Sequence, residues 1–461
     1  MDKRFPIQDQ IEMLGAMLRG RVITPAQADY EALRLVALAQ FDTRRPAAIV
    51  RVATPSDIAT TLNFAQATDL PLAIRAGGHS TGGYGVADGA LVIDLRDLST
   101  IDIDTAARTV WAGAGCTAAE VTHAVEQRGL IVGFGDAGTV GIAGLSLGGG
   151  IGYLARKHGL TIDSLLAVEI VTASGDILIA DNTNHADLFW AVRGGGGNFG
   201  VVTRFKYRLQ PLPAFTGGPL VFPPVPEIIA AFVRLADQAP DELTAIAMVM
   251  PLPPAPFIPV EAEGKLAFVA MMAYAGDAEA AQKALAPFRA LATPLADLVG
   301  PAPYSSLYML DPPPEMRGMV AVRSRFTKDF GLDDARALVN AANACTAPMS
   351  MSQIRVLGGA HARVATDATA FAHRGSRFMV SFLAMYGGGP DEVAAQERWA
   401  GDAVAAVAPV SDGTYVNFLG DAEARGLASA YPAATLERLR RVKRRYDPEN
   451  LFRLNTNITP A

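Results

Sequence analysis

The stretch that decides the fold is RAGGHSTGG, residues 75–83. Four of its nine residues are glycine, and a residue without a Cβ lets the backbone come close to a ligand. His79, in the middle, has a ring nitrogen that can act as a nucleophile. The loop therefore predicts a binding site for a flat aromatic ligand against His79. The alternative is a tight turn with a surface or hydrogen-bonded histidine.

The residues before and around this loop predict a mixed α/β unit. Strands are expected at residues 48–52 and 72–75, with a helix at 55–67 between them, N-capped by Thr54 and started by Pro55. A helical lead-in is expected near residues 8–18. Shorter elements follow up to about Leu209, and they are expected at residues 91–94, 109–112, 118–127, 165–172 and 176–179.

The second half of the chain has a different pattern. Five prolines crowd one span and predict an interdomain connection: Pro211, Pro213, Pro223, Pro224 and Pro226. Long strands are expected at 266–274, 318–326, 350–358 and 378–386, with helices at 278–291 and 334–344 between them. This pattern favours an antiparallel sheet with helices on one face, hence an α+β fold. A basic amphipathic helix at 433–445 ends the pattern.

Three glycine-rich segments lie in the first half: residues 77–83, 148–152 and 194–200. Backbone N–H groups in such loops bind phosphate groups, so they indicate a nucleotide cofactor, whereas tight turns are the alternative for each segment alone. The segment GIGYLA, residues 150–155, matches the dinucleotide fingerprint but does not follow a strong strand. A nicotinamide-binding Rossmann fold is therefore not favoured.

Composition excludes several classes of function. The chain has 461 residues, 50% hydrophobic and 19% charged, which is enough for two domains. The net charge of −6 and the scattered Lys and Arg residues argue against nucleic acid. Cys116 and Cys345 are too few for a zinc site or a disulfide framework, and no metal is expected. Without a signal peptide or a long apolar run, we expect a soluble cytoplasmic protein with no membrane partner.

Six segments together resemble the berberine bridge enzyme-like branch of the vanillyl-alcohol oxidase and p-cresol methylhydroxylase (PCMH) flavoprotein superfamily. The chain is similar to bacterial members of the 6-hydroxy-D-nicotine oxidase type. The segments are RAGGH (75–79), GIAGLSLGGGIG (141–152), RKHGL (156–160), DLFWAVRGGGGNFG (187–200), YVN (415–417) and YDPENLF (446–452).

The resemblance implies a PCMH-type FAD-binding domain at about residues 42–212, within a first unit of residues 1–209. A substrate domain would span 210–412, and residues 413–461 would return to the FAD domain. It also implies FAD bound covalently to His79 through the 8α carbon. The other implied cofactor-binding residues are Arg75, Ala76, Gly77, Gly78, Ser80, Thr81, Ala137, Gly138, Thr139, Val140, Gly141, Gly144, Leu147, Gly148, Gly149, Gly150, Gly152, Gly200, Val201, Val202, Tyr415 and Asn417.

Two positions refine this expectation. Some family members make a second covalent bond from a cysteine that corresponds to Ala137, which has no thiol, so a single link is expected. Both cysteines are expected to be structural thiols. The residue corresponding to Val140 lies near the site of oxygen reaction in related oxidases, so Val140 favours O2 as electron acceptor. Core packing is the alternative for Val140.

Four residues are the candidate catalytic groups. The resemblance places Tyr415 and Asn417 on the substrate side of the flavin, and along a strand both would point to one face. Tyr415 is a candidate base, provided that a cation or hydrogen-bond donor lowers its pKa; packing at the domain seam is the alternative. Gln353 and Arg355 share one face of the predicted strand 350–358 and either line the pocket or form a solvent-facing edge.

Less weight falls on other residues. His361 is expected at a turn in a structural role, and Tyr304, Tyr308 and Tyr386 either form aromatic walls or pack in the core.

The predicted activity is that of an FAD-dependent oxidase. It would take a hydride from a small alcohol, sugar or amine onto flavin N5 and return the electrons to O2 as H2O2. A flavin dehydrogenase, a flavin–oxygen-adduct oxygenase and a non-catalytic flavin-binding protein stay open, as does a homodimer.

Overall fold

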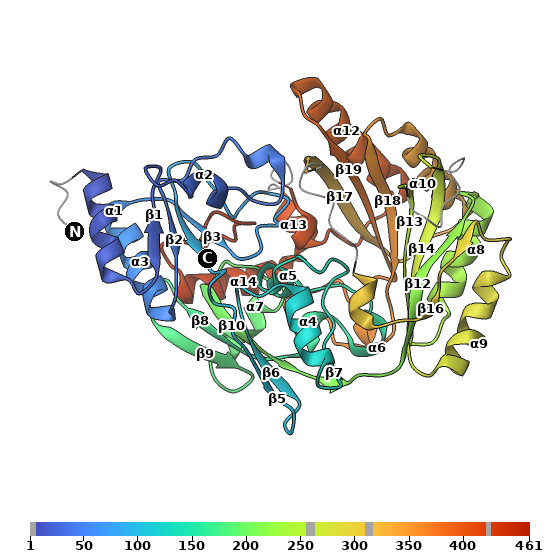
Figure 1. Ribbon diagram of the computed structural model, residues 1–461, viewed down its shortest axis with the longest axis horizontal. Coiled ribbons are helices and arrows are strands. Elements are labelled where there is room, and N and C mark those ends of the chain that lie inside the picture. Colours follow the sequence, from blue (N-terminus) through green and yellow to red (C-terminus); the bar gives the residue numbers. More distant parts are fainter. Residues whose placement is uncertain (1–5, 255–262, 309–316, 421–425) are drawn as a thin grey trace.

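The computed structural model describes residues 6–254, 263–308, 317–420 and 426–461. It has two lobes (Figure 1), with both termini in the lobe formed by the first half of the chain. The second lobe is dominated by one large sheet whose helices lie on its outer side. A large cavity is lined by residues from both lobes.

The first sheet carries the histidine loop at its edge. Its order is β1 (Arg21–Ile23), β2 (Ala48–Arg51), β4 (Leu91–Asp94) and β3 (Leu72–Arg75). Helix α3 (Pro55–Thr68) joins β2 to β3, and its first turn is capped by Thr54, whose Oγ1 accepts the N–H of Asp57 at 3.3 Å. The cap and Pro55 at the first position confirm the prediction. β2 and β3 are not neighbours, however, since β4 lies between them and pairs with both in parallel.

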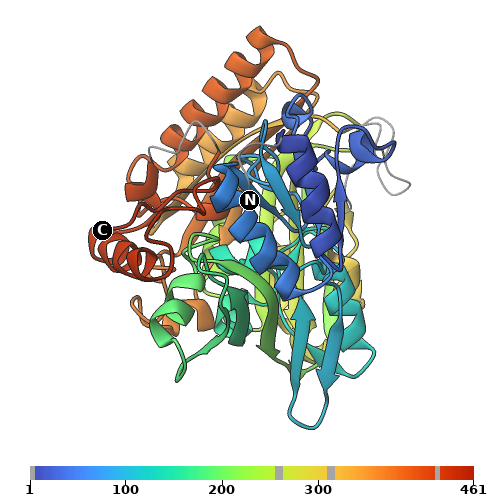
Figure 2. The same cartoon turned by 90° about the vertical axis from the view of Figure 1, so that its left-hand side faces the viewer.

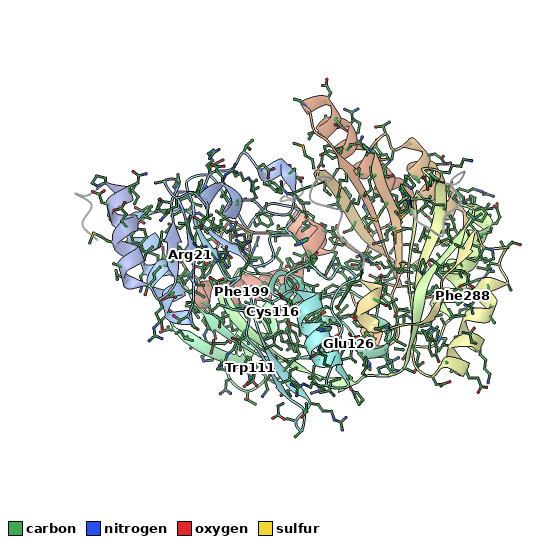
Figure 3. The ribbon with its side chains drawn as sticks, viewed as in Figure 1. Arg21, Trp111, Cys116, Glu126, Phe199 and Phe288 are labelled. Carbon is green, nitrogen blue, oxygen red and sulfur yellow. The ribbon has the colours of Figure 1, made fainter. Side chains whose placement is uncertain are left out.

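A second, antiparallel sheet completes the N-terminal lobe. Its order is β5 (Ile101–Asp104), β6 (Thr109–Gly113), β10 (Val201–Arg208), β8 (Leu165–Val171) and β9 (Ile177–Asp181). Figure 3 labels Phe199 and Cys116 inside this lobe, where both side chains are buried in one hydrophobic core. The lobe's smaller elements are α1 (Ile7–Met17), α2 (Tyr30–Leu33), η1 (Ala39–Phe41), α4 (Ala118–Glu126), β7 (Leu130–Ile131), α5 (Ile142–Gly148), α6 (Ala155–His158), η2 (Thr161–Asp163), α7 (Ala186–Val192) and β11 (Gln210–Pro211).

The large sheet of the second lobe is antiparallel throughout, as predicted. Its order is β15 (Ala296–Asp297), β12 (Phe215–Phe222), β14 (Leu266–Ala275), β13 (Leu243–Pro251), β18 (Met349–Val356), β19 (Phe378–Tyr386) and β17 (Met319–Thr327), with β16 (Gly300–Pro301) also paired to β12. One face is covered by α8 (Pro226–Asp237), α9 (Ala278–Arg289), α10 (Leu332–Ala344) and α12 (Pro390–Val407), whose apolar residues share a core with it. The other face turns toward the N-terminal lobe. Two further short elements are η4 (Tyr304–Leu307) and α11 (Ala360–Arg363).

The proline-rich span contains the connection and also elements of the second lobe. Strand β11 pairs with β7 in the first lobe and β12 begins at Phe215, so residues 212–214 link the two sheets. Residues 215–222 form strand β12 inside the large sheet, and Pro226 starts helix α8. Pro219 is tolerated because it lies between the positions that pair with β15 and those that pair with β16, where its missing N–H leaves no ladder bond open.

The last part of the chain returns to the first lobe. After η6 (Val416–Phe418) and α13 (Leu427–Ala430), helix α14 (Ala433–Tyr446) packs against α7 (Figures 1 and 2). Tyr446 donates its hydroxyl hydrogen to Asp187 at 3.0 Å, and the Tyr431 hydroxyl donates to the carbonyl of Gly194 at 2.9 Å. The predicted unit limits at 209/210 and 412/413 stay predictions.

Candidate functional site

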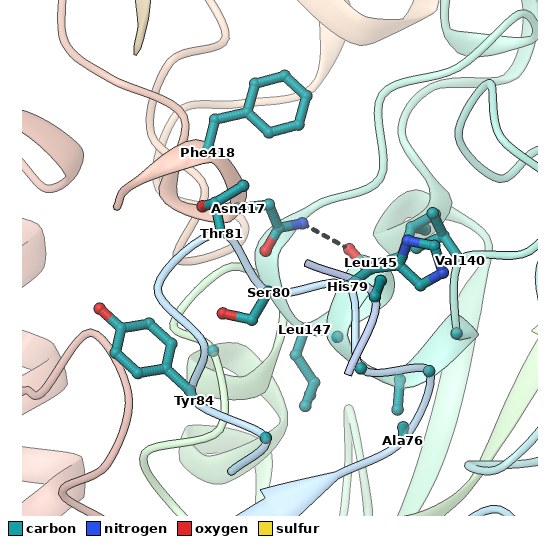
Figure 4. A pocket seen from close by; sticks show the side chains of 18 of the residues that line it. Ala76, His79, Ser80, Thr81, Tyr84, Val140, Leu145, Leu147, Asn417 and Phe418 are labelled. Carbon is teal, nitrogen blue, oxygen red and sulfur yellow. Dashed lines mark hydrogen bonds between the residues drawn. The ribbon is translucent and has the colours of Figure 1, made fainter. Parts of the chain in front are cut away.

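A cavity of about 820 Å³ lies where the two lobes and the returning C-terminal segment meet. This volume is in the range of sites that hold cofactors and drug-sized ligands. Its lining includes the loop after β3, residues 35–38, Leu95 and Arg96, and the region around α5 with the glycines 195–197 and residues 200–202. It also includes strands β17 to β19 and two C-terminal stretches, at 415–419 and between Phe452 and Thr456. Figure 4 shows the part of the cavity around His79.

The loop that carries His79 is held by a close approach of two glycine backbones. A Cβ on Gly77 would stand 2.4 Å from the backbone nitrogen of Gly141, and a Cβ on Gly141 would stand 2.5 Å from that of Gly77. Gly78 has a positive φ of 75°, which glycine adopts without strain. The Thr81 hydroxyl donates to the carbonyl of Leu419 at 3.1 Å. His79 therefore lies on a fixed loop between α5 and the C-terminal segment.

A buried charge cluster lies beside the start of this loop. Arg75, at the end of β3, donates to Asp94 on β4 at 2.8 Å, and Arg96 donates to the same carboxylate at 2.6 Å. Burial alone would raise the pKa of Asp94, but the two guanidinium groups outweigh it and hold that pKa below its usual value. Arg75 and Arg96 both line the cavity. Two cations that share one carboxylate leave this end of the cavity positively charged.

The glycine run 194–197 is joined to the end of α5. The carbonyl of Leu147 accepts the N–H groups of Gly194 at 2.9 Å and Gly196 at 3.0 Å. Gly144 and Gly197 line the cavity, and a Cβ on either would meet no atom within 4 Å. Space for a ligand therefore exists at both glycines.

A buried ion pair ties the C-terminal segment to this glycine run. Lys443 is fully buried and donates to Asp447 at 2.6 Å, to the carbonyl of Asn198 at 2.8 Å and to that of Phe452 at 3.0 Å. Asp447 also accepts the N–H of Leu451 at 2.7 Å. The motif around Asp447 thus positions the cavity-lining residues that follow it, and the sequence analysis did not assign it this role.

Tyr415 and Asn417 lie together on the cavity, although not on a strand. Tyr415 precedes the short helix η6, so the predicted alternation along a strand was wrong. The two side chains meet because the Tyr415 hydroxyl oxygen accepts the Asn417 Nδ2–H at 3.0 Å, and it also accepts the N–H of Gly150 at 2.9 Å. Asn417 Nδ2 donates to the carbonyl of Leu145 at 3.1 Å as well, the bond drawn in Figure 4.

The donors that Tyr415 needs are therefore present, but they do not lower its pKa overall. Burial raises the pKa of the Tyr415 hydroxyl above its ordinary value, although Gly150, Asn417 and the charge of Arg355 act in the opposite direction. The hydroxyl therefore carries its proton at neutral pH. Because both bonds use oxygen lone pairs, that proton is left to donate.

Gln353 and Arg355 line the cavity from β18, and the alternative of a solvent-facing edge is wrong. β18 lies between β13 and β19, and both side chains are buried. Arg355 donates to Asp136 at 2.7 Å, to the Gln353 Oε1 at 2.9 Å and to the carbonyl of Ile151 at 3.1 Å. The Ser381 hydroxyl donates to the same Gln353 oxygen at 3.2 Å. Arg355 is thus held in place by one carboxylate and two oxygens.

Most of the predicted site residues line the cavity, and six do not. Those that line it are Arg75, Ala76, Gly77, Gly78, His79, Ser80, Thr81, Ala137, Val140, Gly141, Gly144, Leu147, Gly200, Val201, Val202, Gln353, Arg355, Tyr415 and Asn417. Those outside the lining are Gly138, Thr139, Gly148, Gly149, Gly150 and Gly152. Gly148 and Gly152 instead leave room for close packing, since a Cβ there would stand 2.0 Å from Asn417 Oδ1 and 1.8 Å from the carbonyl oxygen of Phe134. The segment 150–155 follows helix α5, not a strand.

Four further candidates lie away from the cavity lining: His361, Tyr304, Tyr308 and Tyr386. His361, in α11, is buried and packs 5.8 Å from the ring of Phe371, centroid to centroid. Tyr304, Tyr308 and Tyr386 are buried in apolar clusters. Cys116 is buried and Cys345 is partly buried, and both are free thiols. Core packing is therefore the account that fits these tyrosines.

The described part of the chain has neither a cluster of metal ligands nor a membrane-spanning helix. Between residues 6 and 461, apart from the three undescribed internal gaps, no three His, Cys, Asp or Glu side chains lie close enough to hold a metal ion. In the same residues, no helix has the length and apolar character needed to cross a membrane.

Two family models match the chain. The FAD binding domain model matches residues 46–181, which include the His79 loop. The model described as berberine and berberine like matches residues 414–459, which include Tyr415, Asn417 and the Lys443–Asp447 pair. The two models thus cover the His79 loop and the C-terminal segment that packs beside it.

Whole-chain comparisons agree with these models. An uncharacterized FAD-linked oxidoreductase, YgaK of Bacillus subtilis, is 30% identical over 457 residues, covering 96% of this chain and 97% of that protein. The (R)-6-hydroxynicotine oxidase of Paenarthrobacter nicotinovorans is 28% identical over 461 residues, covering 96% and 97%. The crystal structure of 6-hydroxy-D-nicotine oxidase from Arthrobacter nicotinovorans superposes with a TM-score of 0.86 at 26% identity, covering 96% of this chain and 98% of that one. The fold is that of the PCMH-type flavoproteins, and the chain belongs to the berberine bridge enzyme-like family of FAD-linked oxidoreductases.

Proposed function

We propose that this protein is an oxidase that holds FAD covalently through His79, removes a hydride from a small organic substrate and returns the electrons to O2. The observation that carries the proposal is the shared cavity. His79 lines it from the N-terminal lobe, while Gln353 and Arg355 line it from the large sheet. One ligand in this space would touch the nucleophilic imidazole and the polar groups of the opposite wall.

The residues on the N-terminal side fit FAD. Gly144 and Gly197 leave open space on the cavity surface, and Gly196 has a positive φ of 70° beside them. Arg75 and Arg96 share a single carboxylate, so the local charge suits a pyrophosphate. When bound, FAD supplies an electrophilic 8α carbon for His79 and a hydride acceptor at N5.

The link is proposed to be single. The position from which some family members make a second bond is Ala137, which lines the cavity and carries only a methyl group. Cys116 is buried in the core of the N-terminal lobe, and burial raises its pKa to about 12, so its thiol is not a nucleophile at neutral pH.

Tyr415 is proposed to contact the polar group of the substrate. Its hydroxyl oxygen accepts from Asn417 and Gly150, its side chain lines the cavity, and its proton is free to donate. Arg355 and Gln353 would orient the substrate from the opposite side. The role of Tyr415 as the base stays a prediction, since a phenol with a raised pKa must first lose its proton.

O2 as the electron acceptor rests on Val140. Val140 is partly buried, lines the cavity and lies next to Gly141, at the close approach to Gly77. A small branched side chain there would leave room for O2 beside the flavin. A cytoplasmic setting and a homodimer stay predictions.

Anaerobic photometry followed by exposure to air tests the proposal. Purified protein is mixed without oxygen with a panel of alcohols, sugars and amines, and the flavin absorbance is recorded. We expect bleaching by at least one class, and then one H2O2 released per flavin when air is admitted. Bleaching that persists in air would contradict the oxidase and favour a dehydrogenase. No bleaching across the panel would contradict turnover.

A further inference from the structure

The wall that strands β17, β18 and β19 present to the cavity is ordered into an apolar part and a polar part. The apolar part consists of Val320, Val322, Met351, Leu383 and Met385. The polar part consists of Gln353, Arg355 and Ser381. On the opposite face of the same strands, Ile354, Val380 and Phe382 pack into the core under the helices. Successive side chains of a strand point to opposite faces of the sheet, so one face of these strands lines the cavity and the other packs in the core.

The strand register aligns the wall into rows. Leu383 on β19 stands opposite Val322 on β17 and Met351 on β18, and Met385 stands opposite Val320. One step further along β19, Ser381 stands opposite Gln353. Directly paired residues point to the same face. The wall therefore has two neighbouring rows of paired apolar side chains, that of Met385 and that of Leu383. The next row, Ser381 with Gln353, is polar.

The polar row offers hydrogen-bond donors to a ligand. The Gln353 Oε1 accepts from Arg355 Nε and from the Ser381 hydroxyl, which fixes the orientation of the amide. Its Nε2 group has no partner among the residues that the structure describes. The Tyr415 hydroxyl also has its proton to donate. An oxygen acceptor on a ligand is therefore matched to these donors.

The wall carries no net charge. Its one ionised side chain, Arg355, is neutralised by Asp136 at 2.7 Å, with the two side chains 6% and 12% exposed. A charged ligand group against the wall would be desolvated without a partner of opposite charge. A molecule rich in hydroxyl groups would lose hydrogen bonds to water against the methionine, leucine and valine side chains.

We propose that the substrate is a neutral, largely apolar alcohol with one hydroxyl group at one end, an aryl or alkyl carbinol and not a sugar. This rests on the proposed function of the same site. The carbinol C–H bond breaks with its electron pair leaving as hydride to the flavin. The O–H bond releases its proton to water, and its electron pair forms the carbonyl double bond. The two electrons pass to O2, which takes up two protons and becomes H2O2.

A homologous series tests the proposal on the flavin-loaded protein. Straight-chain 1-alkanols from propanol to octanol, benzyl alcohol, glucose and cellobiose are titrated anaerobically, and Kd is taken from the shift of the flavin absorption spectrum before reduction. Burial of one methylene group is worth about a 3- to 4-fold gain in affinity, so Kd is expected to fall by that factor per carbon until the wall is covered. A flat series, or tighter binding of either sugar, would overturn the proposal.

Two substitutions in the wall and one control outside it show whether the wall causes the gain in affinity per methylene group. Leu383→Asn is expected to reduce the gain per methylene to less than twofold, and Met351→Gln serves if Leu383→Asn does not fold. Leu298→Asn replaces a leucine that is 41% exposed and outside the cavity lining, and it should leave the series unchanged. An equal change of Kd per methylene group in wild type, in the wall variant and in Leu298→Asn would contradict recognition by the wall.

The outcomes separate this inference from the proposed function. Sugars that bind and bleach the flavin better than alkanols would refute the inference and leave the oxidase intact. Protein without flavin would refute the proposed function, and calorimetric titration of the same alkanols would still decide whether the wall recognises apolar chains.

Discussion

The two sides of the cavity are built in different ways. On the N-terminal side, the surface is largely backbone: Gly77 and Gly141 touch each other, and Gly144 and Gly197 leave their space open. On the side of the large sheet, it consists of side chains such as Met351 and Leu383, set by strand register. The first surface suits a ligand that every family member shares. The second surface is made of side chains, which can differ between proteins of the same fold.

The largest effect is expected at the ion pair that anchors the backbone-built side. Lys443→Met would leave Asp447 buried without its cation and should lower the free energy of unfolding by about 3–5 kcal/mol, measured by urea denaturation. The matched control, Lys283→Met, removes an exposed pair with Glu279 and should cost less than about 0.5 kcal/mol. If Lys443→Met lost as little stability as the control, the buried pair would not anchor the C-terminal segment.

The next largest effect concerns the rate of flavin reduction and not folding. It lies at Tyr415, in the C-terminal segment that lines the cavity and not on the strands of the large sheet. Tyr415→Phe removes a hydroxyl that touches the cavity and should slow flavin reduction roughly 10²-fold in stopped-flow measurements. Tyr386→Phe alters a buried tyrosine outside the cavity lining and should leave the rate unchanged. A Tyr415→Phe enzyme as fast as wild type would remove Tyr415 from the mechanism.

A smaller effect is expected where the two glycine backbones meet. Gly77→Ala would push a methyl group against Gly141 and should cost about 1–3 kcal/mol of stability with part of the bound flavin, measured by thermal unfolding and the ratio of flavin to protein absorbance. Gly401→Ala, inside α12 with open space around it, should instead stabilise by about 0.5–1 kcal/mol. Should Gly77→Ala behave like Gly401→Ala, close approach of the loops is not required.

The smallest effect is expected at His361, which packs against Phe371 in the apolar cluster that also contains Tyr415. Burial lowers the pKa of His361 to about 3, so the folded chain holds it neutral. Because its folded pKa lies below the unfolded value of about 6.5, its stabilising contribution is complete above pH 6.5 and is lost as pH falls toward 3. Between pH 7 and 6 this loss is roughly 0.7 kcal/mol.

The expected variant result follows from the same linkage. His361→Leu should make the free energy of unfolding fall less steeply between pH 7 and 6 than in wild type, in urea titrations at each pH. His123→Gln changes an exposed histidine and should keep the wild-type slope. Identical slopes in all three proteins would contradict a buried neutral His361.

The same difference between the two sides explains what the sequence could predict. The His79 loop and the strands around it have local signals, such as the Thr54 cap and the glycines, and these predictions agree with β3 and α3. Strand β13 and helices α8 and α12 were missed, and β12 was taken as part of a connection because prolines flank it on both sides. The partnership of Arg355 with Asp136 joins residues 219 positions apart, and no local pattern encodes it.

Mass spectrometry of the denatured chain tests the central claim most directly. After acid precipitation, wild-type protein should have the mass of the polypeptide plus one FAD, and His79→Ala should have the polypeptide mass alone, while His123→Ala keeps the added FAD. Wild-type protein that releases all its pigment on denaturation, or a His79→Ala chain that keeps the adduct, would contradict the account.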